Sequence, residues 1–333
     1  MASTWSTGGA CESWWPNGGY APVGCGGVGE QLAPGSDLTP VPNGAFVGSR
    51  GTVKDCTCFN VGRDVDNLRK AIVGLGTNEQ AIIEILTHRS NWQRQQICKE
   101  YKATCGRELI DDLKGDLSGD FKHVITALVL PPALFDAQEL ERAMRGPGTN
   151  ESVLIEILAT RSNQQIKEIK EAYRSEYKRE LAKDIAAETS GDFRRALLIL
   201  LEARRDENCQ VVDERLFKSD AQALYKAGEK RLGTDEAKFI EVLCLRSPAQ
   251  LLTINCSKSI PVYFAERIHK SVKGLGTDEN TLSRIMVSRS EIDLLDILDE
   301  YLKLYGRSLY ATIKDETSGD YKNTLLKLCG TGN

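Results

Sequence analysis

Histidine is scarce in this chain: only three of the 333 residues are histidine, and none lies beside a pair of cysteines. A structural zinc site of cysteine and histidine is therefore not expected. The sequence also lacks an apolar run of about eighteen residues and a basic, apolar leader, so it predicts neither a membrane-spanning helix nor a secretory signal. Without such a signal, the ten cysteines are expected to be reduced thiols in the cytoplasm.

Motifs for catalysis and for EF-hands are missing as well. No nucleophile motif, no recognisable catalytic pair of carboxylates and no phosphate-binding loop followed by Lys-Ser/Thr is present, so the sequence does not predict an enzyme. No loop has the alternating aspartates of an EF-hand. The formal net charge is −4, which gives no bulk attraction to nucleic acid or to an anionic lipid surface. Any acidic partner would have to be reached through a bridging cation.

Glycine, proline and tryptophan are concentrated at the start of the chain. The first fifty residues hold eleven of the 29 glycines, five of the ten prolines and three of the four tryptophans, with almost no charge. Such a composition buries too little apolar surface to fold by itself. Residues 1–60 are therefore expected to form a largely disordered N-terminal tail.

Beyond the tail, one short phrase occurs four times, a glycine-bearing turn followed by Gly-Thr-(Asn/Asp)-Glu. Its four copies occupy residues 74–79, 146–151, 231–236 and 274–279. An arginine follows each threonine by twelve residues, at Arg89, Arg161, Arg246 and Arg289. This recurrence identifies a repeat protein. The predicted repeats are 61–131, 132–208, 209–260 and 261–333.

Apolar residues follow each turn at the helical period and strand signals are absent, so the predicted fold is all-α. Each threonine of the phrase is expected to cap the next helix, and Ser90, Ser162 and Ser290 to cap the one after it. The four arginines are expected to bind carbonyls in the last turn of a helix.

Three copies of the phrase have an acidic partner forty residues after the second glycine. These partners are Asp116, Glu188 and Glu316, and Ser-Gly-Asp follows each of them after one residue. The third copy has Lys273 at that distance from Gly233, and only 43 residues separate Thr234 from Thr277. Repeat three is therefore predicted to be truncated, with no adequate helices between Gln250 and Val262.

The fourfold phrase with its distant carboxylate resembles the annexin family, over about Gly51 to Cys329 apart from the gap in repeat three. The resemblance implies a curved, right-handed array of four repeats of about five helices each. It also implies calcium-dependent, reversible binding of a cytoplasmic protein, monomeric in solution, to anionic phospholipid membranes. Inhibition of phospholipase A2 by masking lipid is a further implied role. A helical scaffold, or a splice or gene-model variant with impaired calcium and lipid binding, is the alternative.

The resemblance implies a ligand set for Ca²⁺ in each repeat, in which backbone carbonyls join one carboxylate. The sets are Ile72, Gly74, Gly76 and Asp116 in repeat one; Met144, Gly146, Gly148 and Glu188 in repeat two; Val272, Gly274, Gly276 and Glu316 in repeat four. Repeat three would offer only the carbonyls of Gly228, Arg231 and Gly233. The apolar turn residues Leu75, Pro147, Leu232 and Leu275 are expected to contact the membrane.

Overall fold

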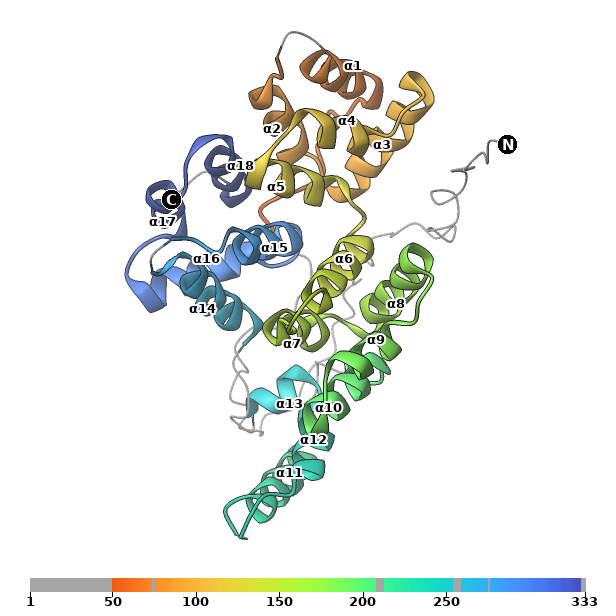
Figure 1. Cartoon of the computed structure of the whole chain (residues 1–333). Helices are drawn as coiled ribbons and strands as arrows, with labels where there is room; N and C mark the ends of the chain where they lie inside the picture. The colour runs from red at the N-terminus through yellow and green to blue at the C-terminus, as the bar shows by residue number, and fades with distance from the viewer. Residues whose placement is uncertain are drawn as a thin grey trace, which may run out of the picture. The chain divides into compact units, whose positions relative to one another are not determined.

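The computed structural model describes residues 50–73, 76–207, 213–230, 232–253, 259–274 and 276–330 (Figure 1). Most of the predicted tail, residues 1–49, lies outside these ranges. Within them all regular secondary structure is helical, with eighteen α-helices and no strand, which confirms the all-α prediction.

Three repeats each contain five helices in the same order. Repeat one comprises α1 (Val61–Ile72), α2 (Glu79–Thr87), α3 (Asn91–Cys105), α4 (Leu109–Asp116) and α5 (Gly119–Val129). Repeat two comprises α6 (Pro132–Met144), α7 (Glu151–Thr160), α8 (Asn163–Tyr177), α9 (Leu181–Glu188) and α10 (Gly191–Leu201). Repeat four comprises α14 (Ile260–Val272), α15 (Glu279–Arg289), α16 (Leu294–Tyr305), α17 (Leu309–Glu316) and α18 (Gly319–Cys329).

Repeat three is shorter, as predicted. It has α11 (Glu214–Ala227), α12 (Glu236–Leu245) and a six-residue α13 (Pro248–Thr253), after which α14 begins. Its buried cluster consists of Leu224, Val242 and Leu251, with Phe239 packed against them. Leu243, on α12, remains 36% exposed. The helices that would cover this face in a five-helix repeat are not encoded here.

The prediction that the phrase threonine caps the following helix is wrong. The N-caps of α2, α7, α12 and α15 are Asn78, Asn150, Asp235 and Asp278. The side chains of Asn78, Asp235 and Asp278 each accept a hydrogen bond from the backbone N–H three residues further on. Asparagine and aspartate are preferred to threonine at the N-cap. The threonine is thereby left outside the helix.

Two of the three predicted serine caps are confirmed. Ser90 and Ser162 form capping boxes with Gln93 and Gln165 at the starts of α3 and α8. Ser290 instead ends α15, where its hydroxyl donates to the Val287 carbonyl at 2.9 Å, and α16 starts after Asp293. The prediction for Ser290 was therefore wrong.

The four arginines bind carboxylates, so the prediction of last-turn carbonyls gives the wrong principal partner. Three of them form two-pronged pairs with an aspartate on the first helix of their own repeat, at 2.6 to 3.0 Å: Arg89 with Asp64, Arg161 with Asp136, and Arg246 with Asp220. In repeat four the equivalent position is Phe264. Arg289 lies over that ring, 4.8 Å from its centre, and pairs with Asp293.

Repeats far apart in the sequence are packed together. Helix α15 contacts α5, and α18 contacts both α2 and α5, so repeats one and four share one apolar core. Repeat four also meets repeat two through a buried ion cluster, in which Arg284 binds Glu156 at 2.8 Å and Glu139 at 3.3 Å. Burial raises the pKa of Glu139, against the opposing effect of Arg142 and Arg284.

Candidate functional site

The first helix of each complete repeat ends at the first predicted carbonyl ligand. Helices α1, α6 and α14 end at Ile72, Met144 and Val272, whose side chains are buried. The last carbonyls of a helix have no partner within it. Among the described residues, no hydrogen bond ends on these three carbonyls, nor on those of Gly76, Gly146, Gly148, Gly274 and Gly276. The repeats thus present unpaired carbonyl oxygens at the negative end of a helix dipole.

Among the described residues, one backbone hydrogen bond closes each of these turns. The N–H of the N-cap residue donates to a carbonyl seven residues earlier, inside the preceding helix. The pairs are Asn78 to Ala71 at 2.8 Å, Asn150 to Ala143 at 2.8 Å and Asp278 to Ser271 at 2.7 Å. Because this bond uses the penultimate carbonyl of the helix, it leaves the final one free.

The second glycine of each turn has a backbone conformation that other residues rarely adopt. Its φ is +89° at Gly76, +89° at Gly148 and +96° at Gly276. A Cβ added at these positions would meet no atom within 4 Å. The glycines are therefore required by dihedral angle and not by crowding. The space beside them is open to a ligand.

The three predicted carboxylates have equivalent places in the fold. Asp116, Glu188 and Glu316 are the last residues of the eight-residue helices α4, α9 and α17, and all three are exposed. None is ion-paired within the described part of the chain. A negative charge at the C-terminal end of a helix is unfavourable, so these positions favour a bound cation.

In repeats two and four, a threonine hydroxyl joins the glycine turn to the residue that carries the carboxylate. The Thr149 hydroxyl lies 3.2 Å from the Glu188 carbonyl and 3.4 Å from its carboxylate, and that of Thr277 lies 3.3 Å from the Glu316 carbonyl. Residues 39 apart in sequence are thereby adjacent in space. This role was not predicted from the sequence. A usable signal was present, because threonine occurs in all four copies although asparagine or aspartate beside it could cap the helix.

Repeat three has a different turn. Its closing bond joins the Asp235 N–H to the Ala227 carbonyl at 2.8 Å, eight residues apart, so the turn is one residue longer. Gly228 is the C-cap of α11 with φ −115°, whereas Gly233 retains φ +85°. Lys273, at the distance where a carboxylate would be needed, is the C-cap of α14. No carboxylate of its own repeat completes this turn.

Two of the four predicted membrane-contact residues can be placed. Pro147 is exposed, and Leu232 is fully exposed. Leu75 and Leu275, together with the predicted ligands Gly74 and Arg231, lie outside the described residues.

Side chains alone do not form a metal site in the part of the chain that is described: no group of three or more His, Cys, Asp or Glu residues there is arranged to hold an ion. Among the same residues, no helix has the length and apolar character needed to cross a membrane. A Ca²⁺ site among these residues would therefore need backbone oxygens as ligands.

Comparison with known proteins settles the family. A family profile described as Annexin matches residues 63–128, 135–200, 219–257 and 263–328, so the third match is the short one. The chain belongs to the annexin family. It is 55% identical to human annexin A3 over 317 residues, which cover 86% of this chain and 98% of that protein. It is 49% identical to mouse annexin A4, with 84% and 98% covered.

Solved annexin structures have the same fold. The structure titled annexin III superposes with a TM-score of 0.83 at 54% identity, covering 86% of this chain and 99% of the other. A calcium-bound annexin (Sm)1 superposes with a TM-score of 0.75 at 36% identity, covering 84% and 93%. Annexins are in general non-enzymatic proteins that bind phospholipid membranes in a calcium-dependent way, and membership of this family supports that general function here.

Proposed function

We propose that this annexin binds anionic phospholipid membranes through Ca²⁺ ions that bridge its glycine turns to lipid headgroups. The proposed carbonyl ligands are Ile72, Gly74, Gly76, Met144, Gly146, Gly148, Val272, Gly274 and Gly276. The proposed carboxylate ligands are Asp116, Glu188 and Glu316. The observation that supports the proposal is that, in repeats two and four, helix-end carbonyls without a partner among the described residues lie beside an exposed glutamate that is not ion-paired there.

Calcium suits this donor set. It takes six to eight oxygen ligands at about 2.3–2.6 Å and tolerates irregular geometry. Three carbonyls and a two-pronged carboxylate supply five oxygens, which leaves about two positions for water or a lipid phosphate. One protein charge per site makes calcium affinity weak in the absence of lipid, towards about 10⁻⁴–10⁻³ M. Because lipid completes the coordination, calcium and membrane strengthen each other's binding by the same factor.

Binding of this kind is reversible, so the protein would move between the cytoplasm and a membrane surface as calcium changes. The exposed tips at Pro147 and Leu232, with Leu75 and Leu275, would enter the interfacial zone of the bilayer. In repeat three, Gly228, Arg231 and Gly233 would form at most a partial site, because the turn is longer and has no carboxylate. Masking of lipid in this way would also hinder a phospholipase A2, which stays a prediction.

Sedimentation with vesicles tests the proposal. With phosphatidylserine vesicles, we expect the protein to sediment in calcium and to remain in the supernatant after chelation, since the net charge of −4 offers no other attraction. A modest rise in salt should matter less than removal of calcium, because coordination is screened less than diffuse charge attraction. Equal sedimentation in calcium and in chelator would contradict the proposal and favour a helical scaffold.

A further inference from the structure

Two cysteines in the segment before α1 have adjacent thiols. Cys56 and Cys58 are separated by one residue, and their sulfur atoms lie 3.6 Å apart. Cys58 is exposed, and Cys56 is partly exposed. Two thiols therefore touch each other at a place that a small reagent in solution can reach.

The two cysteines lie in a tight turn that is fastened to α3. The Phe59 N–H donates to the Cys56 carbonyl at 3.3 Å, which closes the turn. The buried side chain of Gln93 holds the backbone of Cys56, because its amide oxygen accepts from the Cys56 N–H and its amide nitrogen donates to the Cys56 carbonyl, each at 2.9 Å. The rings of Phe59 and Trp92 also pack edge to face, with 6.4 Å between their centres. The fold thus holds the two thiols in place.

A guanidinium group lies near both thiols. Arg89 pairs with Asp64 at 2.6 Å, and this hydrogen bond is the main cause that raises the pKa of Arg89. Cys56 and Cys58 add a smaller electrostatic contribution in the same direction. The attraction is mutual, so the guanidinium favours the thiolate form of either cysteine. Reactive cysteines are typically partly exposed and close to a positive charge, as these two are.

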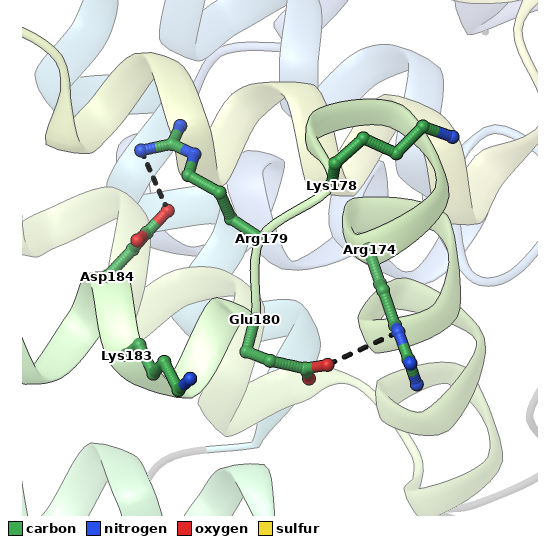
Figure 2. A pocket seen from close by; sticks show the side chains of 6 residues that line it. All are labelled: Arg174, Lys178, Arg179, Glu180, Lys183 and Asp184. Carbon is green, nitrogen blue, oxygen red and sulfur yellow. Dashed lines mark ion pairs between the residues drawn. The ribbon is translucent and has the colours of Figure 1, made fainter.

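The open pocket between α8 and α9, shown in Figure 2, provides a contrast. Both of its carboxylates are ion-paired, Glu180 with Arg174 at 3.3 Å and Asp184 with Arg179 at 3.1 Å. Its lining residues other than Asp184 are exposed, and no polar atom among them is buried without a hydrogen bond. Solvated ion pairs of this kind are ordinary surface features and indicate no ligand. The two thiols differ because contact between them makes a specific reaction possible.

We propose that Cys56 and Cys58 are a redox modification site, which a hydroperoxide oxidises to a disulfide within the turn and a thiol reductant restores. The Cys58 sulfur attacks one oxygen of the hydroperoxide and the O–O bond breaks. The other oxygen leaves with the thiol proton, as water or an alcohol, and Cys58 becomes a sulfenic acid. The Cys56 sulfur then attacks the Cys58 sulfur, the S–O bond breaks, and water leaves with the proton of Cys56.

Two electrons thus pass from the two sulfurs to the hydroperoxide. Two molecules of a thiol reductant return them by thiol–disulfide exchange and become a disulfide themselves. In a reducing compartment the disulfide of the turn would therefore be transient. The two cysteines lie outside the glycine turns, so this inference does not depend on the proposed calcium sites.

Digestion with trypsin, which cleaves after lysine and arginine, makes the test specific to these thiols. Residues 55–63 are released as one peptide that contains Cys56 and Cys58 and no other cysteine. Two partly exposed cysteines of α3, Cys98 and Cys105, fall in the separate peptides 95–99 and 103–107 and serve as internal controls. The full-length protein is exposed to dilute hydrogen peroxide, free thiols are alkylated at intervals, and the peptides are quantified by mass spectrometry.

We expect peptide 55–63 to lose two hydrogen atoms and both alkylation sites together, about tenfold faster than the control peptides lose theirs. A thiol reductant should then restore both sites. The inference would be overturned if Cys56 and Cys58 stay reduced while the control thiols react, if they carry separate adducts, or if they become linked to other cysteines of the chain.

Two matched variants test whether the fold prepares the thiols for this reaction. Gln93→Leu removes the side chain that holds Cys56, whereas Gln165→Leu removes the equivalent capping-box glutamine of α8, in a repeat that has no cysteine. Both variants lose a capping box and share its cost in stability. We expect the disulfide to form roughly threefold more slowly in Gln93→Leu and at the unaltered rate in Gln165→Leu, because proximity of the thiols is lost only in the first. Equal rates, or a faster reaction in Gln93→Leu, would overturn the inference.

Discussion

Repeat two and repeat three open with the same three pieces, a helix, a glycine turn and a second helix, but only repeat two continues through α8, α9 and α10. The carbonyl half of the proposed calcium site is local, because it belongs to the turn. The carboxylate half is supplied by Glu188, 40 residues beyond Gly148 at the end of α9. Repeat three has a longer form of the local half and no counterpart of the distant one, so the proposed site depends on the whole repeat.

The two repeats also differ in how well the same contact is covered. The pair of Arg161 and Asp136 in repeat two has side chains only 3% and 7% exposed. Arg246 and Asp220 in repeat three meet at the same 2.6 Å, and Asp220 is as buried as Asp136 with 6% of its side chain exposed, but the Arg246 side chain is 21% exposed. The same contact geometry thus occurs with a buried and with a partly exposed arginine, so the effect of solvent exposure on the stability of the pair can be measured.

Completing repeat three should change the stability of the fold more than any other variant described below. Insertion of a segment of the length of α8 to α10 between Gln250 and Val262 should bury Leu243, Leu252 and the rest of Phe239. Full burial of a large apolar side chain contributes about 1.5–3 kcal/mol. Because Leu243 and Leu252 are only 36% and 37% exposed, we expect roughly 2–3 kcal/mol from these three side chains, and the apolar faces of the inserted helices add to it. Thermal unfolding and binding of a dye for apolar surface measure it. Identical melting and dye binding in the short and completed chains would show that α11 and α12 do not need the missing helices.

Breaking the arginine pair should cost more in repeat two than in repeat three. Arg161→Ala leaves the Asp136 carboxylate buried without its partner, which should cost about 3–5 kcal/mol. Arg246→Ala removes a side chain that is already 21% exposed, so water can take its place beside the buried Asp220 and the cost should be about half of that or less. Urea unfolding of both variants gives the ratio. Equal losses would mean that the truncation leaves repeat three as well covered as its sibling.

Glycine replacement should separate the complete turns from the incomplete one. Gly276→Ala and Gly233→Ala impose similar backbone strain, since φ is +96° and +85°. Only Gly276 belongs to a turn with a carboxylate, so only its variant should need several-fold more calcium for half-maximal vesicle binding. The two variants control for each other's loss of stability. A strong calcium defect from Gly233→Ala would show that repeat three is a working site.

The smallest expected change in stability is at Lys178, the C-cap of α8, which has a left-handed backbone with φ +56°. Lys178→Gly should stabilise the fold by about 0.5–1 kcal/mol, because glycine accepts the left-handed cap. The reverse change, Gly106→Lys in repeat one, should destabilise by a similar amount. Chemical unfolding of both proteins compares the two caps directly. A loss of stability from Lys178→Gly would mean that its contacts outweigh the backbone strain.

Local patterns allowed most of the fold to be predicted from sequence. The helical period, the Ser-Gly-Asp breaks and the glycine turns each depend on near neighbours, and the short spacing from Thr234 to Thr277 revealed the truncation. The side-chain partners of the arginines were harder to predict, because tertiary packing determines them. The carboxylates of Asp64, Asp136 and Asp220 reach the arginines only because the first and second helices of a repeat lie side by side.

Some parts of the candidate site could likewise be predicted from local sequence patterns, whereas others could not. The spacing of forty residues pointed to Glu188 and Glu316, and the resemblance to a known family assigned them a role. The threonine links and the extra residue in the turn of repeat three depend on which backbone N–H closes the turn. That choice is made between threonine and the asparagine or aspartate that follows it. Asparagine and aspartate are the better N-caps, so the capping preference pointed to them and the prediction of threonine went against it.

The most direct test of the account is a calcium titration of vesicle binding with single carboxylates removed. Glu188→Gln and Glu316→Gln each remove one negative charge from a proposed site, while Glu202→Gln removes one from an exposed residue at the end of α10 that lies outside any glycine turn. We expect each site variant to raise the calcium needed for half-maximal binding by about three- to tenfold, the double variant to raise it further, and Glu202→Gln to leave it unchanged. Identical titrations for all of these variants and the unaltered protein would contradict the account.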